Sequence, residues 1–151
     1  MPQGLKFAVL ALIAGLVLVS SEALAADHVI KMKNDNGKGA YMVFEPDFLK
    51  VAVGDTITFE PVDPGHDAET IPEIWPDGVP HVQGQLSKPV SFTVTKDGVY
   101  GIKCAPHFAF GMMALIVAGK PVNAAQVDAF KAPPMAQKRF EALKAEFDAA
   151  K

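Results

Sequence analysis

The stretch from Cys104 to Met112 constrains this chain more than any other, because it places three potential metal ligands within nine residues. Cys104 is the only cysteine of the chain, His107 follows three positions later, and Met112 closes the stretch. Thiolate and thioether sulfur together with imidazole suit copper better than magnesium or calcium, which prefer oxygen ligands. The pattern therefore nominates a metal site that the fold has to assemble.

The residues between these side chains indicate a loop rather than a helix. Pro106 lacks a backbone N–H and Gly111 is a weak helix former, so we expect a loop joining a strand that ends near Lys103 to one that starts near Met112. The Cys-x2-His-x4-Met pattern alone does not establish a metal site, because a lone cysteine or methionine often only fills a hydrophobic core. The rest of the chain has to decide between the two interpretations.

The N-terminal segment has the three parts of a secretory signal peptide. A short basic start precedes an apolar run over residues 7–19, and Ala23-Leu24-Ala25 forms a small-x-small cleavage motif. We predict that residues 1–25 are a signal peptide removed before Ala26. A membrane anchor is the alternative, but the apolar run is shorter than the roughly 20 residues that span a bilayer. Residues 26–151 then form one domain with no membrane insertion after cleavage.

Export makes the cysteine count informative. A single cysteine cannot form an internal disulfide, and an exposed free thiol is open to oxidation or intermolecular pairing in an oxidising compartment. Binding a metal as thiolate is one way in which such a residue is used and protected. Export therefore favours the metal interpretation of Cys104.

Alternation of apolar and polar residues predicts short strands through much of residues 28–118. The alternation is clearest at Thr56–Glu60 and at Val90–Thr95, and turn signals such as Lys96-Asp97-Gly98 separate the segments. About eight strands of this kind indicate an all-β fold, an antiparallel Greek-key sandwich or barrel.

Residues 61–89 interrupt this regularity, because prolines recur along them and the periodicity is weak. We expect a long irregular connection with one short strand near residues 81–85. A loop of this length inside a compact domain is usually functional. His66 lies early in it and follows a strand, so it could meet the Cys104 loop at one end of the sandwich.

The C-terminal residues change character and predict two helices, at about residues 123–132 and 135–149. Asn123 and Gln126 have the spacing of a capping box, and Pro133-Pro134 ends the first helix. The second helix carries an apolar face, made by Phe140, Leu143 and Phe147. We expect this face to pack on the sandwich, with a partner-binding helix as the alternative.

His66, Cys104, His107 and Met112 together offer two imidazoles, one thiolate and one thioether. That is the ligand set of a blue-copper electron-transfer site, in which the thioether is a weak axial ligand. Tetrahedral zinc is the competing interpretation, but zinc rarely takes a thioether. His28 and His81 are expected at the surface without a copper role.

Motifs along nearly all of the mature chain closely resemble those of the cupredoxins, the type 1 blue copper proteins. They are the segment Tyr41–Pro46, the turn Val53–Thr56, the segment Pro61–His66, the loop Lys103–Met112 and the two C-terminal helices, which mark one subgroup of the family. The resemblance implies a Greek-key sandwich of about eight strands. It also implies that one copper ion, cycling between Cu(II) and Cu(I), is bound by His66, Cys104, His107 and Met112.

Two positions beside these ligands depart from the family pattern. Asp67 stands where the family has an asparagine that supports the cysteine sulfur and ties the two ligand loops together. A carboxylate donates no hydrogen bond, and its charge favours Cu(II), so we expect a lowered reduction potential. Ala105 stands where threonine or serine is common, which removes a hydroxyl group near the site. Met42 matches a family methionine near the copper-binding imidazole, with core filling as the alternative.

The resemblance implies a diffusible, monomeric periplasmic electron carrier. It would serve denitrification by reducing a copper nitrite reductase or a similar acceptor, and it would take electrons from a cytochrome-type donor. His107 would present its ring edge through an apolar patch that includes Met42, Pro106 and Phe110. Lys38 and Lys103 are candidates for the rim of this patch, where they would steer an acidic partner. Such docking would be small and transient.

Other function classes fit less well. The formal net charge of −3 and the lack of a basic run argue against nucleic-acid binding. A copper-binding or storage protein would use the same ligands but would hold Cu(I) without cycling. A hydrolase using Cys104 and a histidine would leave Met112 without a role, and no oxyanion site is suggested. We therefore expect an electron carrier and not an enzyme.

Overall fold

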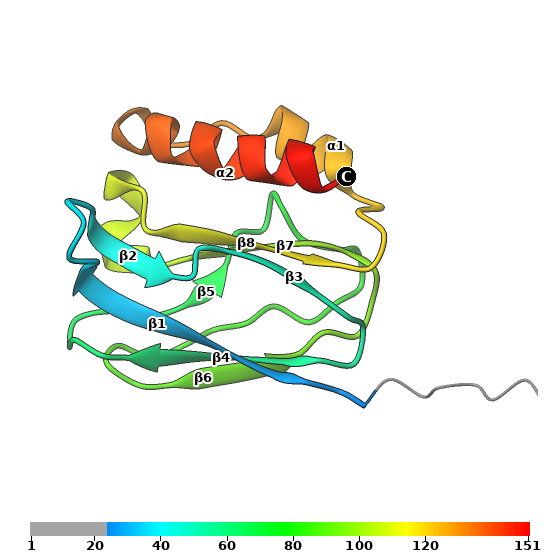
Figure 1. Cartoon of the computed structure of the whole chain (residues 1–151), viewed down its shortest axis with the longest axis horizontal. Coiled ribbons are helices and arrows are strands. Elements are labelled where there is room, and N and C mark those ends of the chain that lie inside the picture. The colour runs from blue at the N-terminus through cyan, green and yellow to red at the C-terminus, as the bar shows by residue number, and fades with distance from the viewer. Residues whose placement is uncertain (1–23) are drawn as a thin grey trace, which may run out of the picture.

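The computed structural model describes residues 24–151, and the predicted signal peptide lies almost entirely outside these residues. Within them the chain forms two four-stranded sheets, with strand orders β2-β1-β4-β6 and β3-β8-β7-β5. A layer of helices covers the second sheet (Figure 1). The strands are β1 (Asp27–Asp35), β2 (Tyr41–Glu45), β3 (Phe48–Val51), β4 (Thr56–Pro61), β5 (Glu69–Thr70), β6 (Val90–Thr93), β7 (Gly98–Lys103) and β8 (Met113–Ala118). The helices are the 3-10 helices η1 (Ala105–Phe110) and η2 (Pro134–Ala136), and α1 (Ala124–Ala129) and α2 (Gln137–Ala150).

The predicted fold class, an all-β sandwich with C-terminal helices, is confirmed. The expectation of purely antiparallel pairing is wrong for two pairs, because β1 runs parallel to β4 and β3 runs parallel to β8. Side chains alternate between the faces of a strand in both kinds of ladder, so periodicity in the sequence does not distinguish them. The strand expected near residues 81–85 is reduced to one isolated bridge between Glu69 and Gln83.

Strand β8 shows why the sandwich needs its helical layer. All six of its residues are buried, because both of its faces are covered. Ala114, Ile116 and Ala118 belong to the core between the sheets, whereas Met113, Leu115 and Val117 belong to the core under the helices. The continuous apolar run of β8 is thus the sequence signature of a strand covered on both sides.

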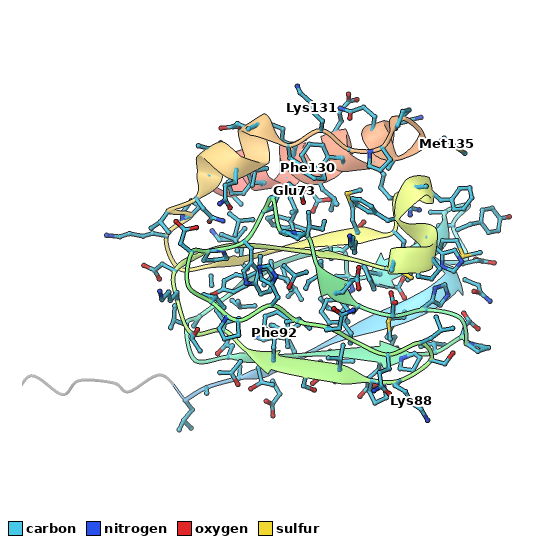
Figure 2. The ribbon with its side chains drawn as sticks, turned by 180° about the vertical axis from the view of Figure 1, so that it is seen from behind. Glu73, Lys88, Phe92, Phe130, Lys131 and Met135 are labelled. Carbon is cyan, nitrogen blue, oxygen red and sulfur yellow. The ribbon has the colours of Figure 1, made fainter. Side chains whose placement is uncertain are left out.

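The helical layer packs through the predicted apolar face. Phe140, Leu143 and Phe147 of α2 are at most 3% exposed, and each such side chain contributes about 1.5–3 kcal/mol by burial. Phe130 adds to this core between the helices and the sheet (Figure 2). The face of α2 is therefore used within the domain, as expected. Of the described residues, none belongs to a helix long and apolar enough to cross a membrane.

The predicted capping box at the start of α1 is absent. The Oδ1 atom of Asn123 accepts a hydrogen bond from Val99 N at 2.7 Å, and its Nδ2 atom donates to Val99 O at 2.9 Å. The Asn123 side chain is therefore occupied by β7 and makes no capping bond to α1. Gln126 accepts from Asn123 Nδ2 at 2.7 Å, so the pair joins the helix to the sheet instead.

Candidate metal centre

The ends of β7 and β8 position three of the four predicted ligands. Lys103 pairs with Met113 in the antiparallel ladder, and Cys104 N donates to Met112 O at 3.0 Å one step beyond it. Met112 N in turn donates to His107 O at 3.2 Å. Cys104, His107 and Met112 are therefore drawn together by the backbone of a closed loop.

We expected a loop rather than a helix between these strands, and this is wrong in part, because the connection contains the 3-10 helix η1. A proline is tolerated in the first turn of a helix, where its missing N–H has no partner to lose, so Pro106 starts this helix rather than preventing it. Gly111 then ends the helix in the left-handed conformation, at a φ of 92°. A short helix explains how residues three positions apart in sequence point to one centre.

Three donor atoms lie close enough to share one ion. His66 Nδ1 is 3.1 Å from His107 Nδ1, and Cys104 Sγ is 3.8 Å from the first and 3.5 Å from the second. A point equidistant from these atoms lies about 2.0 Å from each, which is the radius of the circle through them. Zinc bonds to imidazole nitrogen and thiolate sulfur are ~2.0–2.3 Å, so the three atoms are spaced closely enough to bind one metal ion of this kind.

The four predicted ligands differ in their exposure to solvent. His66, Cys104 and Met112 are fully buried, whereas His107 is partly exposed. Met112 belongs to the same core cluster as Cys104, and Met42 packs against that cluster. A metal ion here would be shielded from water on most sides. The His107 ring would be the ligand that connects it to the protein surface.

The orientation of His66 is fixed by a residue that the sequence did not reveal as functional. His66 Nε2 lies 2.8 Å from Asn34 Oδ1, an amide oxygen that can only accept. Nε2 therefore carries the hydrogen, which leaves the lone pair on Nδ1, the atom that faces Cys104. Burial lowers the pKa of His66, and the neighbouring His107 lowers it further, so the ring stays neutral and able to bind a metal.

The segment that carries His66 is held from outside, because it has little regular structure of its own. Ser87 N donates to His66 O at 2.7 Å, and Gly65 N donates to Ser87 Oγ at 2.8 Å. Asn34 N donates to Asp63 Oδ2 at 2.7 Å. Parts of the chain that lie before and after this segment therefore clamp His66 in place.

Asp67 links the two ligand segments directly. Its Oδ1 atom accepts a hydrogen bond from Ala105 N at 2.7 Å, which joins the residue after His66 to the residue after Cys104. This bond needs only an acceptor, so a carboxylate can make it as well as an amide. Asp67 therefore makes the tie between the loops that the resemblance assigns to an asparagine, and it does so with a carboxylate.

The Cys104 thiol does not ionise readily unless a cation lies beside it. Burial raises its pKa to about 11, and the charge of Asp67 adds to the rise. At neutral pH the protonated thiol is therefore favoured unless a metal ion replaces the proton. The same environment argues against a free nucleophilic thiolate.

Arg139 is a second residue whose role the sequence did not indicate, because it lies outside the apolar face of Phe140, Leu143 and Phe147. Its Nη1 atom donates to Met42 O at 2.6 Å and to Gly111 O at 3.1 Å, and Nη2 donates to Tyr41 O at 2.9 Å. The guanidinium group therefore fastens α2 both to β2 and to the residue before Met112.

A surface groove of about 830 Å³ lies beside the His107 ring, between β2 and the helical layer. Tyr41, Met42 and Phe110 line it, and Met135 overhangs it from the end of the helical layer near η1 (Figure 2). Tyr41, Phe110 and Met135 are more than half exposed. Met42 and Phe110 therefore line one groove with His107, whereas Pro106 lies outside the groove lining.

The predicted rim lysines differ from each other. Lys103 lies 3.4 Å from Glu69 and over the Phe108 ring, so its charge is largely compensated. Lys38 is exposed in the turn between β1 and β2. Neither of these lysines lines the groove, whereas Lys138, exposed on α2, and Arg139 line it and were not predicted to do so.

Comparisons with known proteins agree with this geometry. Residues 30–119 match the family described as copper binding proteins of the plastocyanin/azurin family. The chain is 41% identical over 139 residues to a putative pseudoazurin of Rhizobium leguminosarum bv. viciae, covering 91% of both chains. It is 39% identical over 130 residues to pseudoazurin of Paracoccus pantotrophus, covering 85% of this chain and 89% of the other.

Solved structures give the same result. The native pseudoazurin of Hyphomicrobium denitrificans superposes with a TM-score of 0.77 at 45% identity, covering 80% of this chain and 97% of the other. Pseudoazurin of Methylobacterium extorquens AM1 superposes with a TM-score of 0.76 at 38% identity, covering 80% and 98%. Both levels of identity are high enough to compare sites as well as folds.

Proposed function

The chain belongs to the pseudoazurins of the plastocyanin/azurin family and is thus a copper electron-transfer protein with a single copper ion, and we propose that it carries electrons through the periplasm to a copper nitrite reductase or a similar denitrification enzyme. The observation that carries the proposal is the cluster of His66 Nδ1, His107 Nδ1 and Cys104 Sγ, separated by 3.1–3.8 Å. Met112 would supply a weak thioether ligand.

Copper bound here would supply a one-electron Cu(II)/Cu(I) couple. The protein's own contribution is to hold the ligands still. Asn34 fixes the His66 ring through Nε2, and the β7–β8 ladder fixes Cys104 and Met112. Ligands that do not move on reduction keep the reorganisation small, and electron transfer is correspondingly fast.

We propose that electrons enter and leave through the His107 ring, and that the apolar groove beside it receives the redox partner. His107 is the only partly exposed member of the three-residue cluster. Transient docking requires only a small contact, and exposed apolar residues around an electron exit provide one. We further propose that the protein is a soluble monomer, that its signal peptide is cleaved, and that it catalyses no reaction of its own.

The visible spectrum tests the copper function first. We expect the mature protein to become intensely blue or green on adding Cu(II), to bleach with ascorbate and to recover with an oxidant. A copper storage protein would take up copper without returning through this cycle. A colourless product with a freely titratable Cys104 would instead favour the hydrolase interpretation.

Partner transfer needs its own measurement. We expect the reduced protein to regain its colour when mixed with a catalytic amount of a copper nitrite reductase, only if nitrite is present as the final electron acceptor. Lys144→Gln changes a surface charge on the face of α2 away from the groove. As a control for charges outside the docking surface, it should recolour like the wild type. Recolouring that does not depend on nitrite, or no recolouring at all, would remove this acceptor while leaving the electron-carrier function intact.

A further inference from the structure

The predicted cleavage before Ala26 would expose a tripeptide with its own metal chemistry. Ala26-Asp27-His28 then places a free amine at the first position and a histidine at the third. The amine, the two following amide nitrogens and the Nδ1 atom of the histidine can surround one ion in fused chelate rings. A square plane of nitrogen ligands suits Cu(II) or Ni(II).

We propose that the mature amino terminus is a second metal site, in which Ala26, Asp27 and His28 bind Ni(II) or Cu(II) at the end of the sandwich opposite to the copper centre. The proposal rests on the export and cleavage included in the proposed function. It does not depend on the copper cycle. The β1 strand begins at Asp27 and ends at Asp35 (Figure 1), and its residue Asn34 contacts His66 of the copper centre.

Asp55 already gathers the two outer ligands of this site. Ala26 N donates to Asp55 Oδ1 at 2.9 Å, and His28 Nε2 lies 2.8 Å from Asp55 Oδ2. With Nε2 bonded to the carboxylate, Nδ1 of His28 is the ring atom left for a metal, and it has no hydrogen-bond partner within residues 24–151.

These contacts are compatible with metal binding. A metal-bound amine still carries hydrogen atoms, and a metal-bound imidazole commonly donates its other N–H to a carboxylate. Asp55 can therefore keep both partners and orient the site from behind. Asp27 is exposed, so solvent and metal ions reach the central part of the tripeptide.

Chelation also needs the amide nitrogens of Asp27 and His28, which lie at the start of β1. There β1 pairs only with β4, through Thr56 and Ile57, because its pairing with β2 begins at Lys31. Opening the end of a strand that is paired on one side is among the least costly local changes in a fold. Binding would release the protons of both amides and of the ammonium group, and no electron is transferred.

The test uses exported protein whose copper centre is filled and reduced with ascorbate, so that it contributes no colour. We expect one equivalent of Ni(II) to bind and to give the yellow absorption of a square-planar Ni(II) complex. Inserting a glycine before Ala26 leaves every side chain in place but makes the histidine the fourth residue, and it should abolish the band. His28→Gln should do the same, whereas His81→Gln, at an exposed histidine, should not.

Mass spectrometry of the mature terminus separates the possible failures. If the chain begins at Ala26 and no yellow complex forms, or if His28→Gln still forms it, the site is disproved while the copper function stands. If the chain begins elsewhere, the site and the predicted cleavage are both wrong, and the blue band of the copper centre is again unaffected. Loss of the band in both variants and retention in His81→Gln would establish the site.

Discussion

Two histidines at opposite ends of the sandwich have the same contact and different chemistry. His66 and His28 each have Nε2 at 2.8 Å from a side-chain oxygen, but the oxygen belongs to the Asn34 amide in one case and to the Asp55 carboxylate in the other. His66 is fully buried, whereas the His28 side chain is 25% exposed.

The difference shows how the fold prepares one ring for copper. An amide oxygen orients a buried ring without adding charge, so the ring stays neutral, and burial lowers the pKa of His66. At the other end the carboxylate is the perturbed group, because hydrogen bonds from Ala26 N and from His28 and Ala52 lower the pKa of Asp55 to about 2. The hydrogen-bond acceptor of each histidine, the Asn34 amide or the Asp55 carboxylate, therefore determines the charge and chemistry of that end of the sandwich.

Removing the sulfur of the copper end should have the largest effect. Cys104→Ser replaces the soft thiolate by a weakly acidic hydroxyl group, so the intense colour should be lost completely on adding Cu(II). Ala105→Ser, at the exposed neighbouring position, should retain the band. Visible spectra of both variants check this, and a blue Cys104→Ser protein would rule out Cys104 as the source of the colour.

Changing Asn34, the hydrogen-bond acceptor of His66, tests the comparison between the amide and the carboxylate directly. Asn34→Ala leaves the Nε2–H of His66 without its partner and should weaken copper binding by about 10–100-fold. Asn34→Asp keeps an acceptor and makes this end resemble the Asp55 end, so it should bind copper but with a lower reduction potential. Competition with a copper chelator and redox titration measure the two effects. Equal affinity in all three proteins would contradict the role given to Asn34.

Removing the hydrogen bonds by which Arg139 joins α2 to β2 and Gly111 should have the next largest effect. Arg139→Gln removes charged hydrogen bonds to Tyr41, Met42 and Gly111, which should lower the free energy of unfolding by about 1–3 kcal/mol. The copper spectrum should shift as well, because Gly111 precedes Met112. Denaturant titration and electron paramagnetic resonance measure these changes. Lys138→Gln, at the exposed neighbouring residue, is the control, and a destabilised Arg139→Gln protein with an unchanged copper signal would limit Arg139 to a role in stability.

The sequence made much of the copper end predictable, because Cys104, His107 and Met112 lie in one loop and the proline and glycine mark its limits. His66 could be added once the strands were placed, since it follows β4. The 3-10 helix was not predicted, because the same proline that breaks a helix interior is tolerated in a first turn.

The residues that support the site were not predictable for a different reason. Asn34 stands in a run of turn-forming residues, where an amide is expected to bond to its own backbone. Arg139 lies on a helix whose periodicity shows only which face is apolar, and Asp55 belongs to a Gly-Asp turn. Their long-range partners are 27–98 positions away in the sequence, and only the folded chain brings them together.

The charge beside the copper end should have a smaller effect. Asp67→Asn keeps the acceptor for Ala105 N and removes one negative charge near Cys104, so Cu(I) should be favoured and the reduction potential should rise. A tenfold change in the ratio of Cu(I) to Cu(II) affinity would correspond to about 59 mV. Redox titration of the two proteins measures it. An unchanged potential would show that the carboxylate charge is neutralised or too well screened to act on copper.

The Asp55 end should give the smallest effect, and one that is visible only in acid. Because the folded pKa of about 2 lies below the usual value for aspartate, the stabilisation is fully present above about pH 4 and is lost as the pH falls toward 2. The difference in thermal midpoint between the wild type and Asp55→Asn should therefore be constant near neutral pH and shrink over this window. Asp27→Asn, at an exposed position, should show no such narrowing. A difference that persists unchanged at pH 2 would mean that Asp55 acts through packing, and that the ionised carboxylate is not what distinguishes this end from the amide at the copper end.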